Sequence, residues 1–394
     1  MRGLAACPAS AIPDLQAAVG QALDRRLRRG TVRPIAVALS GGGDSLALTL
    51  IAAAWARAAG RPLLVLTVDH RLQPASAEWT AACATTAERL GAGFRALVWE
   101  GEKPTSGLPA AARAVRHALI ADAAREARAS VVLMGHTADD VAEARRMRAA
   151  GSTTPDPREW GPSPAWPEGR GVFLLRPLLG LARSDLRAWL TSRGETWIDD
   201  PANDDLRFAR ARARRSGGPA PVRPEPVDAA DLARACQDDG VGGLGVARAL
   251  LRAAPTDAAR RFVSAACVCA GGTARPPAGA RVERLLARLA GHAAFTSGLA
   301  GARVAADASQ VRFTREPGEA ARGGLLPLRL AAGETGVWDG RFEVSTDAPV
   351  EVRAGRRGAP VAVGVDGEVR EVRLAALVHG RLLAACGAVE REPA

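Results

Sequence analysis

Lysine is almost missing from this chain of 394 residues, in which Lys103 is the only lysine among 53 basic residues. A Walker A phosphate loop requires Gly-Lys-Ser/Thr, and it is excluded because Lys103 is followed by Pro104. The remaining basic residues are arginines, whose planar guanidinium groups suit bidentate contacts with phosphate and RNA. The net charge of +11 therefore favours a polyanionic partner. A GC-rich genome, which replaces Lys by Arg without functional gain, explains the arginine excess equally well.

Long apolar runs and closely paired cysteines are missing as well. The most apolar stretch, 46–56, is well short of the roughly 20 residues needed to cross a bilayer. Pro8 and Pro13 interrupt the N-terminal apolar residues before a signal-peptide core can form. The six cysteines include no C-x-x-C pair, so no zinc or iron–sulfur cluster is expected, and we interpret Cys267 and Cys269 as small apolar residues. These absences favour a cytoplasmic protein without a membrane partner.

The first half of the chain alternates short apolar runs with longer Ala-rich amphipathic stretches, which is typical of a parallel sheet with crossover helices. Buried strands are predicted over 34–40, 62–69, 94–99 and 131–135, and helices over 44–59, 76–90, 108–127 and 138–150. A loop without periodicity, 151–171, is followed by a predicted strand over 172–178 and a predicted helix over 182–193. The sequence therefore predicts an α/β fold with a doubly wound, mostly parallel sheet.

The second half has a different character. A Gly/Pro-rich stretch at 216–226 is typical of a linker, and 227–252 and 256–289 are predicted to be helical. From residue 301 onward, β-type alternation and a turn at Asp339-Gly340 predict short strands. We predict four parts: an N-terminal helix (1–30), an α/β catalytic domain (31–215), a helical domain (216–300) and a small β-rich domain (301–394).

The strongest signal for chemistry is the segment Ser40-Gly41-Gly42-Gly43-Asp44-Ser45, which lies between a predicted strand and a predicted helix. Glycines allow the backbone to turn sharply and approach an anion, and the helix N-terminus offers unpaired N–H groups to phosphate. Asp44 has two candidate uses, capping the helix or holding Mg²⁺ that bridges phosphates. The string Gly240–Gly245 also fits G-x-G-x-x-G, but it follows a helical pattern and no strand, so we interpret it as a turn.

With this loop in place, further segments resemble a known family. Ser-Gly-Gly-x-Asp-Ser after a first strand resembles the PP-loop of the ATP pyrophosphatases, which cleave ATP between the α and β phosphates and adenylate a substrate. The segments 68–72 and 135–140, at the ends of predicted strands, resemble the tRNA-modifying branch. The segment 197–204, followed by Phe208 and a group of arginines, resembles the Asp-Pro-Ser-Asn stretch of the tRNA(Ile)-lysidine synthetases.

The resemblance runs from about residue 35 to residue 215 and leaves the nucleotide loop intact. The chain departs from the family pattern at five positions. It has Val141 where Gln is usual, Ala144 where Thr is usual, Pro109 where Glu is usual, His117 where Tyr is usual and Ala211 where Asn is usual. They lie in segments that the resemblance assigns to finer recognition.

The resemblance implies an ATP-dependent ligase that joins free L-lysine to C2 of the wobble cytidine in the CAU anticodon of tRNA(Ile). An adenylated tRNA would be the intermediate, ATP would yield AMP and pyrophosphate, and the tRNA would change identity from methionine to isoleucine. ATP with Mg²⁺ is the implied cosubstrate complex. The sequence leaves the oligomeric state open, a dimer included.

The resemblance also implies roles for particular residues. Catalysis is expected of Asp44, His136 and Asp139. ATP binding is expected of Ser40, Gly41, Gly42, Gly43, Asp44, Ser45 and Asp69, with Asp44 also a candidate Mg²⁺ ligand. Candidates for contact with lysine or tRNA are Arg113, Asp140, Glu143, Asn203, Arg207, Arg210 and Arg212.

Several alternatives remain at this stage. Asp139 and Asp140 lie in a predicted first helical turn, where carboxylates favour the helix dipole without any catalytic role. The arginines at 207–215 could form an ordinary solvated face. We expect Trp160 and Trp166 to serve packing rather than base stacking. The alternative functions are a tRNA thiolase with the same loop, which normally needs paired cysteines near the site, and an RNA-binding PP-loop protein without catalysis.

Overall fold

The computed structural model describes residues 14–151, 157–199, 212–213, 215, 229–322, 325–355 and 359–394. The chain divides into two compact units. The first comprises Met1–Ser163, Gly171–Arg223 and Arg391–Ala394, and the second comprises Pro164–Arg170 and Pro224–Glu390. Two short segments belong to a different unit from the residues next to them in the sequence. Residues 164–170 belong to the second unit, and residues 391–394 belong to the first. The division into four parts predicted above stays a prediction.

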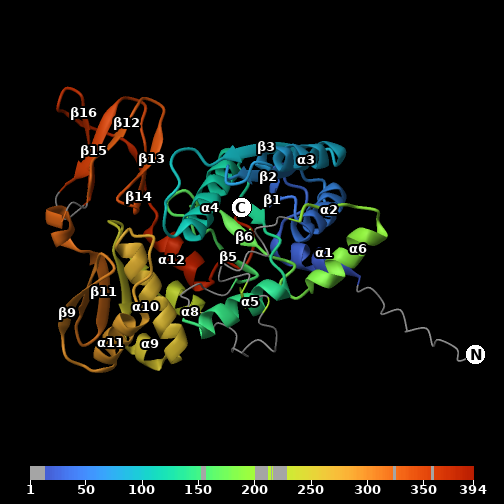
Figure 1. Cartoon of the computed structure of the whole chain (residues 1–394). Helices are drawn as coiled ribbons and strands as arrows, with labels where there is room; N and C mark the ends of the chain where they lie inside the picture. Colours follow the sequence, from blue (N-terminus) through green and yellow to red (C-terminus); the bar gives the residue numbers. More distant parts are fainter. Residues whose placement is uncertain are drawn as a thin grey trace, which may run out of the picture. The chain divides into compact units, whose positions relative to one another are not determined.

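A six-stranded sheet forms the centre of the first unit (Figure 1). Its strands are β1 (Ile35–Ala38), β2 (Leu63–Asp69), β3 (Gly93–Val98), β4 (Val131–Leu133), β5 (Trp160–Pro162) and β6 (Phe173–Leu175). They are ordered β3-β2-β1-β4-β6-β5, and all neighbours are parallel except β5 and β6. The predicted α/β fold with a mostly parallel sheet is confirmed.

One helix, α1 (Leu15–Arg26), precedes the first strand. The others alternate with the strands as predicted: α2 (Gly43–Ala58), α3 (Ser76–Arg89), α4 (Leu108–Glu126), α5 (Ala138–Ala149) and α6 (Arg183–Ser192). Ile120 and Ala124 of α4 form a core cluster with Ala36 on β1 and Leu66 on β2. Successive side chains of a strand point to opposite faces, and Val37 on the other face of β1 is also fully buried. The sheet is therefore covered on both faces, which is why its strands read as continuous apolar runs.

The loop predicted over 151–171 contains a strand that the sequence did not reveal. β5 pairs antiparallel with β6, so that Trp160 lies opposite Leu175. The prediction of a wholly irregular loop was wrong because a three-residue strand containing Gly161 and Pro162 shows no alternation. Trp160 stacks on Phe173 with ring centroids 4.9 Å apart, which confirms the packing role expected for this tryptophan.

The last residues of the chain return to the first unit. Glu392, only 2% exposed, forms a bidentate ion pair with the buried Arg61, with oxygen–nitrogen distances of 2.6 and 2.9 Å. The same carboxylate accepts hydrogen bonds from the Arg28 amide and the Ser130 hydroxyl. Residues 391–394, which we had assigned to the β-rich part, thus help to hold α1 and the start of β2 in place.

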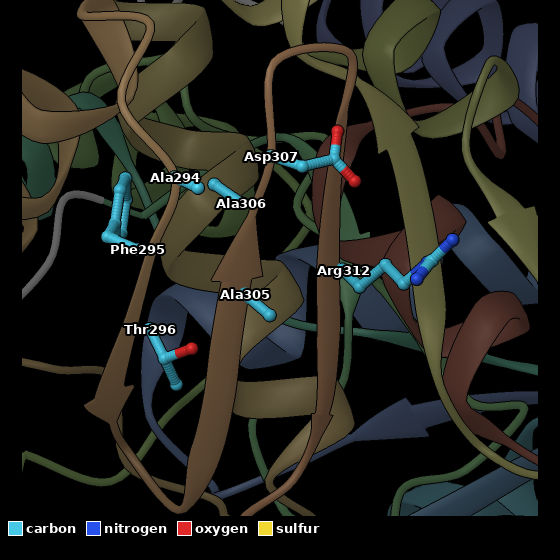
Figure 2. A pocket seen from close by; sticks show the side chains of 7 residues that line it. All are labelled: Ala294, Phe295, Thr296, Ala305, Ala306, Asp307 and Arg312. Carbon is cyan, nitrogen blue, oxygen red and sulfur yellow. The ribbon is translucent and has the colours of Figure 1, made fainter.

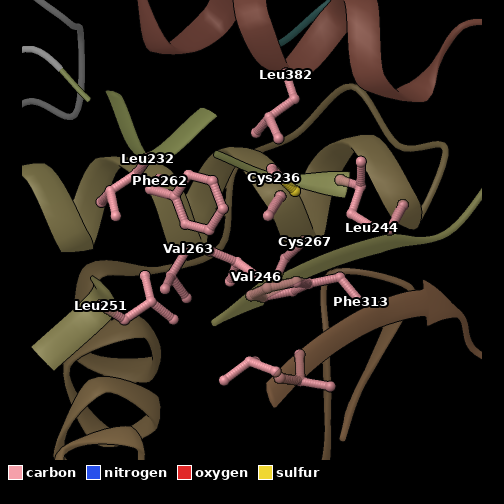
Figure 3. Close-up of a cluster of buried hydrophobic side chains, with 14 of the residues drawn as sticks. Leu232, Cys236, Leu244, Val246, Leu251, Phe262, Val263, Cys267, Phe313 and Leu382 are labelled. Carbon is pink, nitrogen blue, oxygen red and sulfur yellow. The ribbon is translucent and has the colours of Figure 1, made fainter. Parts of the chain in front are cut away.

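The second unit begins with helices and a five-stranded antiparallel sheet. The helices are α8 (Ala230–Arg234), α9 (Arg248–Ala253), α10 (Thr256–Ala270), α11 (Gly279–Ala290) and α12 (Val378–Cys386). The strands are β7 (Gln237–Asp238), β8 (Leu244–Ala247), β9 (Phe295–Leu299), β10 (Ala302–Ala306) and β11 (Gln310–Arg315), in the order β7-β8-β11-β10-β9. Phe262 of α10, Phe313 of β11 and Leu382 of α12 meet in its core (Figure 3).

Two details of this unit bear on the sequence predictions. The helix predicted over 227–252 was wrong, because it contains β7 and β8, strands too short to show a period. The turn predicted at Gly240–Gly245 is confirmed in part. Gly240 and Gly242 have positive φ, and Asp239 Oδ1 accepts from the Gly243 amide at 2.7 Å, but the turn follows the strand β7, and Gly245 already belongs to β8. Burial of Cys267 and Cys269 raises the pKa of each thiol to about 12, in keeping with small apolar residues.

Short strands complete the second unit. They are β12 (Leu328–Leu330), β13 (Thr335–Trp338), β14 (Phe342–Ser345), β15 (Val350–Ala354), β16 (Pro360–Gly364), β17 (Val369–Arg370) and β18 (Arg373–Ala376), preceded by a 3₁₀ helix at Pro317–Arg322. They form the sheets β12-β15-β16-β17 and β13-β14-β18. Asp339 and Gly340 both have positive φ between β13 and β14, which confirms the predicted hairpin turn. Among the described residues, no helix is long and apolar enough to span a membrane.

Candidate active site

The predicted site segments follow three neighbouring strands of the first unit. The loop 40–45 follows β1, Asp69 is the last residue of β2, and 135–140 follows β4. β1 lies between β2 and β4 and is parallel to both. Their carboxyl ends therefore meet at one edge of the sheet, where ligands bind in open α/β folds. The structure thus brings the predicted ATP loop, Asp69 and His136 to one edge.

The loop after β1 leaves the N-terminus of α2 without a side-chain cap. The N-cap residue is Gly42, so the helix begins at Gly43, and the capping alternative for Asp44 does not hold. Ser45 Oγ donates to the Gly42 carbonyl at 2.9 Å and lies 3.1 Å from Ser40 Oγ. The hydroxyls thus fix the loop, and the uncapped start of α2, with its first amides and helix dipole, suits an anion.

Glycine is required at two points of the site. Gly41 has φ +84°, and a Cβ there would come within 2.5 Å of Ile198 Cδ1. A Cβ on Gly135, after β4, would lie 3.0 Å from the Ser45 backbone. The Ile198 amide also donates to the Gly41 carbonyl at 3.0 Å. The 197–199 segment, singled out for its resemblance to tRNA-modifying enzymes, therefore packs directly on the nucleotide loop.

Asp44 projects from the first turn of α2 and forms an ion pair with Arg183, the first residue of α6. Arg183 Nε donates to Asp44 Oδ2 at 2.8 Å. Burial raises the pKa of Asp44, and the hydrogen bond and charge of Arg183 only partly oppose that rise. Burial alone would lower the pKa of Arg183, but its bond to Asp44 and the charges of Asp140 and Glu143 raise it, so the guanidinium stays charged.

The acidic side chains of α5 accept hydrogen bonds from backbone amides at the beginnings of α5 and α6. Asp140 Oδ2 accepts from the Thr137 amide at 2.8 Å, and the two residues form a capping box, so the capping interpretation is confirmed for Asp140. Asp139 Oδ2 accepts from the backbone amide of Arg183 at 2.8 Å and so satisfies the start of α6. Glu143, 1% exposed, lies 3.5 Å from the Arg183 guanidinium.

The end of β2 forms a turn beside aromatic and basic residues. Asp69 Oδ1 accepts from the Arg71 amide at 2.7 Å, and Arg71 has positive φ. His70 packs edge-on against Trp99, and its pKa is lowered by burial and by the charge of Arg116. The single lysine, Lys103, donates to the Trp99 carbonyl and lies over its ring, so it supports this turn.

Basic residues gather around His117 on α4. Burial lowers the pKa of His117 to about 2, and the positive charges of Arg116, Arg113 and Arg176 act in the same direction, followed by that of His136. Burial, Arg113 and Arg116 also lower the pKa of Arg176, to about 10. The candidate arginine Arg113 and the candidate catalytic His136 thus both lie close enough to act on His117, whereas Asp44, Asp140 and Glu143 all contact Arg183.

Some predicted contacts can be placed only in part. Asn203, Arg207 and Arg210 lie outside the described residues. Arg212 is exposed, and the carbonyl of its neighbour Ala213 accepts from Arg146 Nε on α5 at 2.9 Å. This contact brings the end of the arginine-rich segment against the helix that carries Asp140 and Glu143.

Arg183 and Ile198 were missed as site residues in the sequence. Arg183 begins an ordinary amphipathic helix and carries no local motif, so only the fold reveals that it reaches Asp44. Ile198 stands inside a segment that we had singled out, but its packing on Gly41 depends on a contact across 157 positions of the chain, which no periodicity reports. Both residues act through the nucleotide loop.

An open hollow of about 340 Å³ lies on the five-stranded sheet of the second unit. It is lined by Ala294, Phe295, Thr296, Ala305, Ala306, Asp307 and Arg312 (Figure 2). Three alanines and Phe295 line it together with Thr296, Asp307 and Arg312, and no predicted site residue contributes to it. The chemistry predicted from the sequence therefore belongs to the edge of the parallel sheet and not to this hollow.

A parallel sheet whose first strand leads through a glycine-rich loop into an uncapped helix, with an acid in the first turn, defines a nucleotide-binding protein of the PP-loop class. A family model described as a PP-loop domain matches residues 15–220. That match covers the sheet, the loop and the segment that packs on it.

Curated relatives narrow the class. The chain is 46% identical to the tRNA(Ile)-lysidine synthase of Caulobacter vibrioides over 95% of this chain and 98% of that protein. It is 36% identical to the tRNA(Ile)-lysidine synthase of Hyphomonas neptunium over 78% of this chain and 88% of the relative. It is 38% identical to that of Rhizobium meliloti over 81% of this chain and 74% of the relative. The chain belongs to the tRNA(Ile)-lysidine synthase family.

Proposed function

We propose that this protein joins free L-lysine to C2 of the wobble cytidine in tRNA(Ile) with a CAU anticodon, at the expense of ATP. The observation that carries the proposal is the composition of the sheet edge. An anion-binding loop, an acidic group and a cationic group lie there within one unit, and they match a triphosphate, an ammonium group and an RNA backbone respectively. The relatives named above carry the same activity in their names.

The loop 40–45 binds the triphosphate in this proposal. Its glycines and the open amides of α2 are directed to an anion, and the hydroxyls of Ser40 and Ser45 hold the loop shape. Asp69 faces the adenosine side from the neighbouring strand end. Packing of Ile198 on Gly41 gives the loop a fixed wall.

Asp44 fits a magnesium ion that arrives with ATP. Mg²⁺ commonly takes one or two protein carboxylates and completes its octahedron with phosphate oxygens and water. No group of three or more metal-binding side chains occurs in the described parts of the chain, so a single carboxylate completed by substrate is the arrangement that suits these residues. When bound, the ion would neutralise charge on the phosphates.

Asp140 and Glu143 attract the ammonium group of lysine. Both carboxylates are nearly buried, and Asp140 keeps one oxygen toward the site while the other caps α5. Arg113, Asn203, Arg207, Arg210 and Arg212 are the proposed contacts with tRNA, in keeping with the salt-dependent phosphate binding of arginine-rich segments.

The reaction proceeds in two displacements. The C2 oxygen of cytidine attacks the α-phosphorus of ATP, a P–O bond forms and pyrophosphate leaves. The ε-amine of lysine then attacks C2, AMP leaves with the original oxygen, and the nitrogen loses a proton. His136, which follows β4, and Asp139, in the first turn of α5, are the proposed groups that assist these steps. Fixing the reactants in position supplies much of the acceleration.

Incorporation of labelled lysine tests the proposal. Purified protein, Mg²⁺·ATP, radiolabelled lysine and a CAU-anticodon tRNA(Ile) transcript should yield acid-precipitable label, and a transcript with U34 should not. Asp44→Asn, which keeps the shape but removes the charge, should reduce the rate by 100-fold or more, the scale of a lost electrostatic contact in catalysis. Absence of label with the wild-type protein and the CAU transcript would refute the assignment.

The alternative of a tRNA thiolase finds less support. Cys83 is the one cysteine among the described residues of the first unit, it is buried, and burial raises the pKa of its thiol. A lone thiol held protonated does not supply the paired cysteines that such chemistry normally uses.

A further inference from the structure

Arg183 carries a guanidinium group that contacts three acids of the proposed site. Its Nε lies 2.8 Å from Asp44 Oδ2, its Nη2 3.4 Å from Asp140 Oδ1 and its Nη1 3.5 Å from Glu143 Oε1. Asp44 belongs to the nucleotide loop helix, whereas Asp140 and Glu143 belong to α5. One cation thus links the proposed ATP half of the site with the proposed lysine half.

The backbone of Arg183 is anchored at the same place. Its amide donates to Asp139 Oδ2 at 2.8 Å, and the Ala138 amide donates to the Leu181 carbonyl at 3.0 Å. The beginnings of α5 and α6 are therefore tied together by two hydrogen bonds. Because the Cα of Arg183 is fixed, the guanidinium is preorganised between the carboxylates.

The side chains of this cluster are sheltered, with exposures of 16% for Arg183, 19% for Asp44, 9% for Asp140 and 2% for Glu143. The guanidinium of Arg183 is attracted to all three carboxylates. Away from bulk water such interactions are stronger than at an exposed surface. Without Arg183 the carboxylates would repel each other and the triphosphate.

We propose that Arg183 is a positioning residue that acts as a built-in counter-ion for both halves of the site. It neutralises Asp44 beside the triphosphate, and it competes with the ammonium group of lysine for Asp140 and Glu143. This inference rests on the proposed function, because it takes ATP and lysine as the ligands. It assigns a role to a residue that carries no sequence motif.

The proposal predicts opposite effects on the two ligands. Arg183→Gln keeps a polar side chain that reaches as far as the Nε position but removes the charge. ATP without Mg²⁺ should bind about tenfold more weakly, the scale of one charge-assisted hydrogen bond, because Asp44 then faces the phosphates without its hydrogen-bonded cation. Lysine should bind several-fold more tightly, because its ammonium group no longer competes with a guanidinium. Arg183→Lys restores the charge and should return both affinities toward the wild-type values.

Equilibrium dialysis with the full-length protein measures both affinities without catalysis. ATP without Mg²⁺ and L-lysine are titrated separately against wild type, Arg183→Gln, Arg183→Lys and the control Arg193→Gln. Arg193 lies at the other end of α6, where it covers the Trp189 ring, so its loss should leave both affinities unchanged. Circular dichroism shows whether each variant is folded.

Opposite shifts in Arg183→Gln would support the inference. A fall of both affinities together would limit Arg183 to a structural role and overturn the inference. Unchanged affinities, or a wild-type protein that does not bind lysine, would also overturn the inference. If the glutamine variant does not fold, a lysine variant with ATP affinity reduced tenfold would overturn it and near-wild-type affinities would support it. Lysine incorporation into tRNA by the wild type tests the proposed function separately, whatever dialysis shows for Arg183.

Discussion

Gly135 illustrates how a single residue of this site is constrained by the space beside it. A Cβ at this position would meet the backbone of Ser45 at 3.0 Å, and backbone moves less readily than a side chain. Gly135→Ala should displace the nucleotide loop, lower stability by about 1–3 kcal/mol and weaken Mg²⁺·ATP binding. Chemical denaturation and ATP titration measure the two effects. Gly161→Ala, where a Cβ meets nothing within 4 Å, is the matched control, and equal behaviour of the two variants would contradict the account.

Burial of His117 makes the free energy of unfolding of the protein depend on pH. Its pKa of about 2 in the folded protein lies below the value near 6.5 expected in the unfolded chain. The unfolded chain therefore binds more protons below pH 6.5, and the free energy of unfolding should fall by about 1.4 kcal/mol for each pH unit of acidification. Urea denaturation at pH 7.5 and pH 5.5 measures this fall.

The matched variants identify the source of that pH dependence. His117→Phe should remove most of it, whereas His292→Gln, at an exposed position, should leave it as in the wild type. A pH dependence that survives in His117→Phe would assign it to other groups.

At the residue level, some contacts of the site could be predicted from the sequence and others could not. The glycines and Asp44 could be predicted because their spacing to a strand and a helix is local. Arg183 could not, because its role depends on a contact with Asp44 across 139 positions of the chain. Asp140 was open between capping and ligand binding, and the structure confirms the cap while one of its oxygens faces Arg183.

On the scale of elements, α6 begins at a carboxylate supplied by another helix. Asp139 accepts from the amide of Arg183, and α6 has no side-chain cap of its own. Asp139→Asn keeps an acceptor and should retain stability, whereas Asp139→Ala should lose about 0.5–2 kcal/mol, the usual value of a cap. If Asp139 also takes part in catalysis, both variants should lose lysine incorporation.

Thermal unfolding together with the incorporation assay separates these two roles. Full activity in Asp139→Asn would limit Asp139 to the cap. Lost activity with unchanged stability would establish a chemical role in addition.

The strands β1 to β3 and the helices α2 to α6 were predicted almost to their ends, because each is long enough to show its period or its apolar run. α4, for example, was predicted over 108–127 and spans Leu108–Glu126. β5, β7 and β8 were missed. They have two to four residues, and pairing with a neighbour, rather than their own sequence, makes them strands.

At the scale of the whole molecule, the buried pair Arg61–Glu392 joins the end of the chain to the first unit. Burial alone would raise the pKa of Glu392, but hydrogen bonds from Arg61 and the Arg28 amide lower it below its usual 4.5. Its contribution to stability is therefore present above about pH 4.5 and is lost as the pH falls further. Glu392→Gln should cost about 3–5 kcal/mol, because it leaves the Arg61 charge buried without its partner.

Guanidinium denaturation of the first unit, followed by tryptophan fluorescence, measures that cost. The control is Glu390→Gln, because the Glu390 side chain is 71% exposed in its ion pair with Arg234 and should contribute little. Equal stabilities of the two variants would show that residues 391–394 do not stabilise the unit.

The net charge of +11 is a property of the whole molecule. The structure adds that Asp44, Asp140 and Glu143 all contact Arg183, whereas the charges of Arg113 and Arg176 act on the buried His117. The excess of arginine over acidic residues suits a polyanionic partner such as RNA.

Mass spectrometry of the nucleosides from the treated tRNA is the most direct test of the proposed function. After reaction with Mg²⁺·ATP and lysine, a CAU-anticodon tRNA(Ile) should yield a cytidine heavier by one lysine less one water, located at the wobble position. The gain should be absent without ATP and with Asp44→Asn. An unmodified wobble cytidine after reaction with the wild-type protein, or a gain of sulfur instead, would contradict the account.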